Sequence, residues 1–322
     1  MPDIIIVGAG FMGKTHAKAY AGIPKANVVA VVDVDPDRAL CFGHGKPYTL
    51  LEKALRDTDA EIVDICLPTP YHAVAIEQAV QAKANIICEK PVTMEMAEAE
   101  KLRELIERAE IKFMAAQVVR FWPEYTKAVE LIARGELGRI QSVDVQRLAA
   151  RPGWGEWFKD PAKSGGALFD LHIHDIDYLI ATFGEPVKIG AVGVKGEFGA
   201  WDSVVSSLSY RGFYATARCS YLMPPAYGFR HGYTIVGTEG TLRYEMAVSG
   251  NVESRHDSKD LMLYKGGECL CIAADPGDAY QRELAYFVDC VVNHKQVKTA
   301  SMSDVIKTLR ILHDIRTCLE TA

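Results

Sequence analysis

The first third of the chain alternates short apolar runs with segments of helical pattern. The apolar runs have the length of strands and contain few polar positions: Ile4–Val7, Val28–Val32, Ile62–Leu67, Ile86–Cys88 and Phe113–Ala116. The segments between them are rich in Ala, Glu, Lys and Leu: Thr15–Ala21, Leu51–Leu55, Ala73–Ala82 and Ala97–Arg108. This alternation predicts an α/β domain, a doubly wound parallel sheet with helices on both faces.

The pattern changes after Phe121. A helix, a long strand and an apolar helix are expected at Tyr125–Arg134, Ile140–Ala149 and Gly166–Phe183. From Val187 to Ile272, alternating segments rich in β-branched and aromatic residues predict a large open, mostly antiparallel sheet. Two helices follow, at Ala279–Asn293 and from the cap Ser301 to Leu319. We therefore expect two domains, residues 1–121 and an α+β domain at 122–322.

Composition narrows the class of protein. The 322 residues are 49% hydrophobic and 24% charged, as in ordinary globular proteins. A formal net charge of −6 without a long basic run argues against nucleic-acid binding, and no apolar run approaches the length of a membrane span. The first apolar run is too short for a signal peptide, and the eight cysteines contain no C-x-x-C. We expect free thiols and a cytoplasmic location.

The first strand leads directly into Gly8-Ala9-Gly10-Phe11-Met12-Gly13, a G-x-G-x-x-G motif. Alone the motif is a weak signal, but a strand before it and a helix after it are the context that dinucleotide binding requires. The glycines permit a tight turn, approach of a pyrophosphate to the backbone and close helix–strand packing. The helix N-terminus then faces the phosphates. The motif predicts a Rossmann βαβ unit.

The second strand ends at Asp33, 20 residues after Gly13. A carboxylate there accepts hydrogen bonds from the adenosine ribose and repels a 2′-phosphate. The next residues, Val34-Asp35-Pro36, contain no Arg or Lys, although Arg38 is near. We predict NAD as cofactor in preference to NADP.

Two places carry candidate catalytic chemistry. Lys90 follows the fourth strand within Glu89-Lys90-Pro91, at the sheet edge where ligands bind, and its charge would favour alkoxide character on a substrate hydroxyl. The alternative is that Lys90 is an ordinary surface lysine exposed to solvent. Asp170 and His174 share one face of the apolar helix, so the carboxylate would orient the imidazole as a general base. Asp177 lies three residues beyond His174 and is a second candidate partner, and a purely structural His174 is the alternative.

The run His172-x-His174-Asp175 also raises the question of a metal site. Two histidines two residues apart on a helix point in different directions, and no further cluster of ligands is evident. We therefore expect no metal.

These motifs together resemble the glucose–fructose oxidoreductase / inositol dehydrogenase / MocA family. The resemblance spans nearly the whole chain and is carried by the opening glycine motif, the Asp33 strand end, Pro68-Thr-Pro-Tyr-His72, Glu89-Lys90-Pro91, Ser164-Gly-Gly-Ala-Leu-Phe-Asp170-Leu-His-Ile-His174, Gly237-Thr-Glu-Gly-Thr-Leu242 and Asp278-Ala-Tyr280. The E-K-P triplet followed by G-G-x-x-x-D-x-x-x-H is its most specific part.

The resemblance implies roles for particular residues. Lys90, Asp170 and His174 would be catalytic, with His174 as general base. Cofactor contacts would come from Gly8, Gly10, Phe11, Met12, Gly13, Asp33, Thr69, Pro70, His72, Glu89 and Lys90. Substrate contacts would come from Trp154, Trp157 and Tyr280, although the tryptophans and Arg151 would equally serve to anchor a long loop. Family members commonly pair through the open sheet, so a homodimer or homotetramer is expected.

The expected function is hydride transfer between the CH–OH of a sugar or inositol-like cyclic polyol and a nicotinamide cofactor. One alternative is a non-catalytic dinucleotide-binding sensor that regulates a partner, although the retained Lys90, Asp170 and His174 argue against it. Another keeps the fold but recycles an enclosed cofactor, or reduces an aldehyde or imine. The sequence does not name the substrate.

Overall fold

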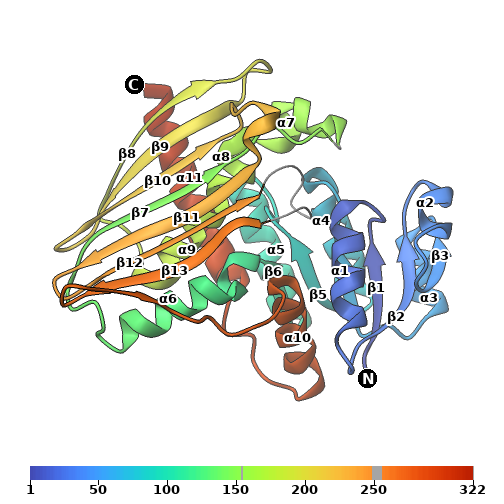
Figure 1. Ribbon diagram of the computed structural model, residues 1–322. Coiled ribbons are helices and arrows are strands. Elements are labelled where there is room, and N and C mark those ends of the chain that lie inside the picture. Colours follow the sequence, from blue (N-terminus) through green and yellow to red (C-terminus); the bar gives the residue numbers. More distant parts are fainter. Residues whose placement is uncertain (154, 249–255, 322) are drawn as a thin grey trace. The chain divides into compact units, whose positions relative to one another are not determined.

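The computed structural model describes residues 1–322 apart from Trp154, residues 249–255 and Ala322 (Figure 1). The chain divides into two compact units. Unit 1 comprises Met1–Phe121 and Gly277–Ile306, and unit 2 comprises Trp122–Pro276 and Lys307–Ala322.

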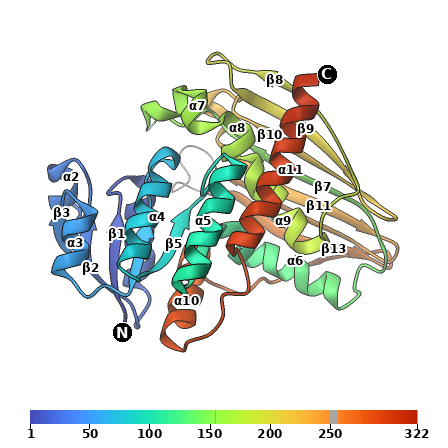
Figure 2. The same ribbon diagram turned by 180° about the vertical axis from the view of Figure 1, so that it is seen from behind.

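Unit 1 is built on a six-stranded parallel sheet with the strand order β3-β2-β1-β4-β5-β6. Its strands are β1 (Asp3–Val7), β2 (Asn27–Val32), β3 (Lys46–Tyr48), β4 (Ile62–Ile65), β5 (Asn85–Glu89) and β6 (Phe113–Ala116). Its helices are α1 (Phe11–Ala21), α2 (Pro36–Leu40), α3 (Leu51–Asp57), α4 (His72–Gln81), α5 (Met96–Ala109) and α10 (Ala279–Val292). Figure 1 looks onto α1 and Figure 2, from behind, onto α4 and α5, so helices cover both faces. The predicted doubly wound parallel sheet is confirmed.

The sequence pattern missed α2 and β3. The strand β3 has three residues, one of them Pro47, and pairs with β2 through Ala30↔Lys46 and Val32↔Tyr48. A run this short shows neither an apolar block nor an alternation, because Tyr48 is its only buried position. Its place at the sheet edge therefore depends on the neighbouring strand.

Unit 2 contains an eight-stranded sheet with the order β14-β13-β12-β11-β7-β10-β9-β8. Its strands are β7 (Ile140–Leu148), β8 (Lys188–Lys195), β9 (Trp201–Ser209), β10 (Tyr214–Ser220), β11 (Phe229–Gly237), β12 (Thr241–Val248), β13 (His256–Lys265) and β14 (Glu268–Cys271). The β7–β10 pair is parallel, and the other pairs among the described residues are antiparallel. This confirms the predicted large, mostly antiparallel sheet.

Helices lie against one face of the unit 2 sheet (Figure 2). They are α6 (Pro123–Ala133), α7 (Pro161–Ser164), α8 (Gly166–Asp170), α9 (His172–Phe183) and the part of α11 (Met302–Thr321) that belongs to unit 2. On β9 the helix-facing Val204 and Leu208 are fully buried, whereas Val205 points to the other face and is 39% exposed. That second face also carries the exposed Val192 and Tyr214. The sheet is therefore open on one side in the single chain.

The domain boundaries differ from the prediction in one respect. The first boundary falls at residue 121, as expected, but the prediction placed all of 122–322 in one domain. Residues 277–306 instead belong to unit 1, because α10 packs its buried Leu284 and Phe287 there and contacts α1. The side-chain amide of Gln281 also donates to the Gly22 carbonyl at 2.6 Å. An amphipathic helix does not reveal in its own sequence which sheet it will cover.

Two other helix predictions can be judged. The cap at Ser301 is confirmed, since its Oγ accepts the Asp304 N–H at 3.3 Å while the Asp304 carboxylate accepts the Ser301 N–H at 3.1 Å. The single helix expected at Gly166–Phe183 is instead two helices, α8 and α9, with Leu171 between them.

Among the described residues, no helix combines the length and the apolarity that a membrane crossing requires.

A buried ion pair joins the helix layer of unit 2 to its sheet. Arg147 of β7 donates to Asp175 of α9 through Nη2 at 3.0 Å and Nε at 3.3 Å, and the two side chains are 5% and 0% exposed. Burial raises the pKa of Asp175, and the guanidinium of Arg147 opposes that rise. A pair of this kind is costly to break from one side, because the remaining charge stays buried.

We predict that Arg147→Met lowers the free energy of unfolding by about 3 kcal/mol near neutral pH, measured by urea denaturation. Arg243→Met is the matched control, since Arg243 is exposed and pairs with Glu245 at the surface, where a loss below about 1 kcal/mol is expected. Without Arg147 the buried Asp175 takes up a proton as the pH falls, so the deficit should shrink from about pH 8 to about pH 5. A deficit equal to that of the control would show that the buried pair of Arg147 and Asp175 contributes no more than a surface pair.

Candidate active site

The glycine turn connects β1 to α1 in unit 1. Gly8 has φ +108°, a conformation that favours glycine, and a Cβ there would lie 2.6 Å from the Cys66 carbonyl oxygen. A Cβ on Gly13 would lie 1.9 Å from the Gly8 carbonyl oxygen. Gly10 differs, since nothing lies within 4 Å of a Cβ added to it. Gly8 and Gly13 therefore allow the chain to pack, while Gly10 leaves the open space that a pyrophosphate approaching the backbone needs.

Asp33 follows β2 and is tied to the same turn. Its Oδ2 accepts the N–H of Ala9 at 2.8 Å, and its Oδ1 accepts the N–H of Asp35 at 2.9 Å. The side chain is half-buried, and each carboxylate oxygen has a further lone pair with which to accept a hydroxyl. The Asp33 carboxylate can therefore do two things at once. It holds the glycine turn, and it offers hydrogen-bond acceptors to a ligand hydroxyl next to that turn. These residues fit a nicotinamide dinucleotide.

The loops after β4 and β5 carry the remaining predicted residues of unit 1. Thr69 is buried and Pro70 exposed in the short 3₁₀ helix Thr69–Tyr71 that precedes α4. His72 is fully buried, with Nε2 2.7 Å from the Leu67 carbonyl oxygen and Nδ1 3.0 Å from that of Pro91. Its ring therefore connects the two loops to each other. A direct cofactor contact by His72 remains a prediction.

Glu89 and Lys90 stand at the end of β5. The Glu89 side chain is buried, whereas Lys90 is partly exposed and follows directly after the last residue of the strand. In a parallel sheet the carboxyl ends of the strands lie at the edge where ligands bind. Lys90 therefore lies at the same edge of the unit 1 sheet as the glycine turn and Asp33.

Asp170 and His174 lie in unit 2, on either side of the short interruption between α8 and α9. Leu171 keeps a right-handed helical conformation, with φ −96° and ψ −50°, and its N–H donates to the Ala167 carbonyl at 3.0 Å. The helical path is therefore maintained, and the spacing of four residues places Asp170 and His174 on one face. Both are half-buried, while Ile173 and Asp175 beside His174 are buried.

The other polar residues of α9 have structural partners. His172 is fully buried with Nε2 2.7 Å from Ser206 Oγ, and burial lowers its pKa to about 3, so it is neutral. Asp177 is also buried, and its Oδ1 accepts the hydroxyl of Thr308 at 3.0 Å. Asp177 therefore contacts α11 through this oxygen, and the pairing of Asp170 with His174 stays a prediction. His172 points to β9, so the H-x-H run does not converge on one point.

The loop that follows β7 contains the predicted substrate contacts of unit 2. Trp154 lies outside the described residues. Trp157 stacks on Phe158 with ring centroids 4.0 Å apart and is half-exposed. Arg151 donates to the Asp202 carboxylate and, at 3.2 Å, to the Phe158 carbonyl oxygen, so it anchors the loop. Tyr280, the third predicted contact, lies in unit 1 with its ring 6.2 Å from that of His16.

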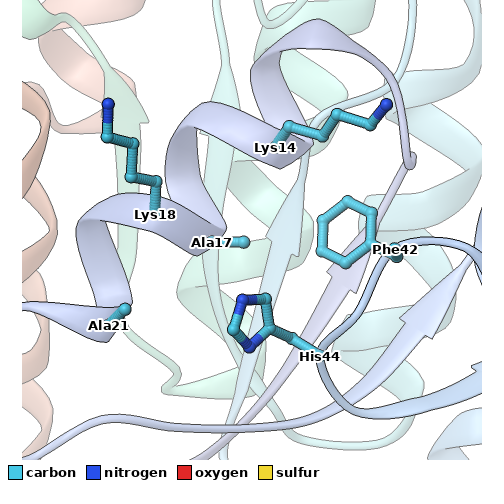
Figure 3. Close-up of a pocket in the computed structure, with 6 residues that line it drawn as sticks. All are labelled: Lys14, Ala17, Lys18, Ala21, Phe42 and His44. Carbon is cyan, nitrogen blue, oxygen red and sulfur yellow. The ribbon is translucent and has the colours of Figure 1, made fainter.

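A shallow pocket of about 250 Å³ lies on the flank of α1 (Figure 3). Its lining consists of Lys14, Ala17, Lys18, Ala21, Phe42 and His44. None of the predicted site residues contributes to it, so it does not mark the candidate site.

His16, Asp64 and Cys66 were not predicted as a cluster from the sequence, and they lie together and buried in unit 1. The available signal was Asp64, a charged residue inside the apolar strand β4, because a buried carboxylate requires a partner. The Asp64 Oδ2 is 2.9 Å from His16 Nδ1.

With this geometry established, comparison with known proteins identifies the family. Residues 3–117 match the oxidoreductase family with an NAD-binding Rossmann fold, and residues 125–243 match the GFO/IDH/MocA C-terminal domain. The two matches follow one another along most of the chain. The chain belongs to the GFO/IDH/MocA oxidoreductase family.

Individual relatives agree with this assignment. The chain is 30% identical over 208 residues to an inositol 2-dehydrogenase of Rhizobium meliloti, covering 62% of each chain. It is 25% identical to a D-apiose dehydrogenase of Paraburkholderia graminis, covering 95% of this chain and 84% of the relative. The fold matches an aldose–aldose oxidoreductase from Caulobacter crescentus, crystallised with glycerol, at a TM-score of 0.86, 20% identity and coverage of 99% and 98%.

The glycine turn yields a matched pair of variants. We predict that Gly13→Ala lowers the melting temperature and abolishes NAD binding, since its Cβ would collide with backbone. Gly10→Ala should keep the stability within about 1 kcal/mol and weaken NAD binding, because its methyl group enters only the open space. Thermal unfolding and calorimetric titration with NAD measure the two effects. A Gly10→Ala protein that binds NAD as tightly as wild type would show that the pyrophosphate does not approach there.

Proposed function

We propose that this protein is an NAD-dependent dehydrogenase that oxidises a CH–OH group of a sugar or an inositol-like cyclic polyol. The observation that carries the proposal is the half-buried Asp170 and His174 pair on one helical face, in a chain that also has a dinucleotide turn and Lys90 at the edge of its parallel sheet. The relatives that act on inositol and D-apiose support this substrate class. No observation favours the sensor alternative.

The proposed roles follow from the chemistry of each side chain. His174 removes the proton of the substrate hydroxyl, as an imidazole suits proton transfer near neutral pH. Asp170, four residues earlier on the same face, orients the ring and stabilises the imidazolium that forms. Lys90 donates a hydrogen bond to the same oxygen and favours its developing negative charge. The nicotinamide, when bound, supplies the acceptor for the hydride.

We propose NAD as the cofactor in preference to NADP because of Asp33. Its carboxylate stands at the end of β2, where a 2′-phosphate would meet like charge. Its Oδ2 already accepts one backbone N–H from the glycine turn, so the carboxylate is fixed in orientation. A fixed charge discriminates more strongly than one on a side chain that can turn away.

We also propose that copies of the chain pair through the open face of the unit 2 sheet, as a homodimer or homotetramer. That face carries the apolar side chains Val192, Val194 and Tyr214 at 63%, 57% and 52% exposure, and an interface between copies would remove them from water. We further propose that the protein is located in the cytoplasm. All eight cysteines are free, which is compatible with that reducing compartment.

The assignment of catalytic roles is tested with Lys90→Met and His174→Ala. Each should lower kcat/KM for the best substrate of a sugar and polyol panel by at least about 100-fold, followed by the absorbance of the reduced cofactor. Lys53→Met, at an exposed position of α3, is the control and should keep the wild-type rate. If wild type turns over a polyol and both variants keep full rate, the roles are wrong. If wild type turns over no sugar or polyol, the proposed function is wrong.

Cofactor preference is tested with Asp33→Asn, which removes the charge and keeps a side-chain oxygen. The ratio of the Kd for NADP to that for NAD should fall by at least about tenfold, equivalent to about 1.4 kcal/mol. Asp35→Asn removes a charge two residues away at the N-cap of α2, a position that asparagine also suits, and should leave the ratio unchanged. Equal effects of the two substitutions would indicate that the net charge of the loop, rather than Asp33, sets the preference.

A further inference from the structure

His16, Asp64 and Glu89 form a buried charge cluster in unit 1. His16 lies on α1, three residues after Gly13, and Asp64 and Glu89 come from β4 and the end of β5. His16 Nδ1 is 2.9 Å from Asp64 Oδ2, and its Nε2 is 3.3 Å from Glu89 Oε1. The exposed fractions of the three residues are 0%, 0% and 6%. The imidazole therefore links the helix of the glycine turn to two strands at once.

The charges in this cluster compensate one another. Burial is the largest single effect on His16 and would lower its pKa, but the Asp64 carboxylate and Cys66 together raise that pKa well above its usual value. For Glu89, burial would raise the pKa, yet His16 and Lys90 together lower it. An imidazolium therefore stands between two carboxylates. Burying either carboxylate without this cation would be costly.

Three neutral groups also lie around this cluster. Burial raises the pKa of the Cys66 thiol and of the phenols of Tyr20 and Tyr280, so these three groups stay protonated. Glu283 of α10 is also buried near Tyr20 and Tyr280. None of the neutral groups replaces the attraction between His16 and the carboxylates.

Cys66 also contacts this cluster. Its Sγ lies 3.4 Å from both His16 Nδ1 and Asp64 Oδ1. A protonated thiol is a weak hydrogen-bond donor, so it adds little to the attraction between His16 and the carboxylates.

The cluster reaches Lys90 through the second oxygen of Glu89. While Oε1 faces His16, Oε2 accepts the backbone N–H of Lys90 at 3.0 Å. Beyond Lys90, the carbonyl of Pro91 lies 3.0 Å from His72 Nδ1. The main chain at Lys90 is thus held on one side by Glu89 and on the other by His72. Of these two, only Glu89 is linked to the helix of the glycine turn.

We propose that His16 is a positioning residue, which holds the main chain at Lys90 in register with the glycine turn by fixing the carboxylate of Glu89. The inference rests on the proposed function, in which Lys90 acts on the substrate oxygen. A lysine amine stands at the end of a flexible four-carbon stem, so the place of its Cα decides how well the amine is directed. An enzyme reaches its full rate only when the residues around a catalytic side chain hold that side chain in its productive position.

Two neutral replacements separate the contacts of His16. In His16→Asn the amide nitrogen takes the place of Nδ1 and keeps only the bond to Asp64. In His16→Gln it takes the place of Nε2 and reaches Glu89. Glu89→Gln is a third variant, which leaves His16 in the core and weakens its attraction to residue 89. His44→Asn is the matched control, since His44 is an exposed histidine of the same unit.

The first measurement does not depend on activity. Hydrogen exchange of the Lys90 amide, followed by NMR on lysine-labelled protein, should accelerate by at least about tenfold in His16→Asn, as expected when about 1.4 kcal/mol of protection is lost. His16→Gln should restore much of the protection, and Glu89→Gln should fall between the two. His44→Asn should match wild type. Unchanged Lys90 exchange in both His16→Asn and Glu89→Gln would overturn the proposal, even if one of them were less stable.

The second measurement separates positioning from general stability. In His16→Asn, kcat on the best polyol should fall by about 10- to 100-fold, the range expected from a misplacement of up to about 1 Å. The Kd for NAD should change by less than about threefold, and His16→Gln should recover part of kcat. A loss of melting temperature with kcat unchanged would make His16 merely structural and overturn the inference. If wild type turns over no polyol while Lys90 exchange responds as expected, the proposed function fails and the positioning role stands.

Discussion

The structure of unit 1 depends on one geometric constraint: in a parallel sheet, the carboxyl ends of all strands lie at the same edge. Residues that follow β1, β2, β4 and β5 are therefore brought together, although they are separated by many residues in the chain. The glycine turn, Asp33, Thr69 and Lys90 all occupy this edge. A dinucleotide turn and a candidate catalytic lysine thus come together as a consequence of strand direction, before any side chain contact is considered.

Buried charge provides the second level of organisation in both units. The sheet in unit 1 contains Asp64 and Glu89, which are compensated by His16 on α1. The sheet in unit 2 contains Arg147, which is compensated by Asp175 on α9. In each case the ion pair joins a helix to a sheet. The buried charges tolerate little change in their separation, because a charge that loses its partner there is not solvated by water. Such pairs fix where a helix lies along its sheet more sharply than apolar packing alone.

Much of the fold was predictable because its signals are local. The strands β1, β2, β4, β5 and β6 coincide with mostly apolar runs of the sequence, and β6 was predicted with the correct bounds at Phe113–Ala116. The capping box at Ser301 and the glycine motif are equally local. Prediction failed where a segment depends on its neighbours: β3 has one buried residue and forms only because β2 presents a free edge, and the helix expected at 166–183 is interrupted at Leu171. The placement of α10 in unit 1 likewise depends on the surface that receives it.

By itself, the sequence determined the fold class, the dinucleotide turn with Asp33, and the candidates Lys90, Asp170 and His174, because each rests on spacing along one element or on the ends of strands. Only the tertiary structure decided which polar residues are occupied elsewhere. In the folded chain His172 contacts Ser206, and Asp177 accepts a hydrogen bond from Thr308. Arg151 anchors a loop. The tertiary structure also revealed that His16 of one element lies between carboxylates of two others. A pattern along the chain records which residues are apolar or charged, whereas the partner of a buried charge is set by contacts between elements far apart in sequence.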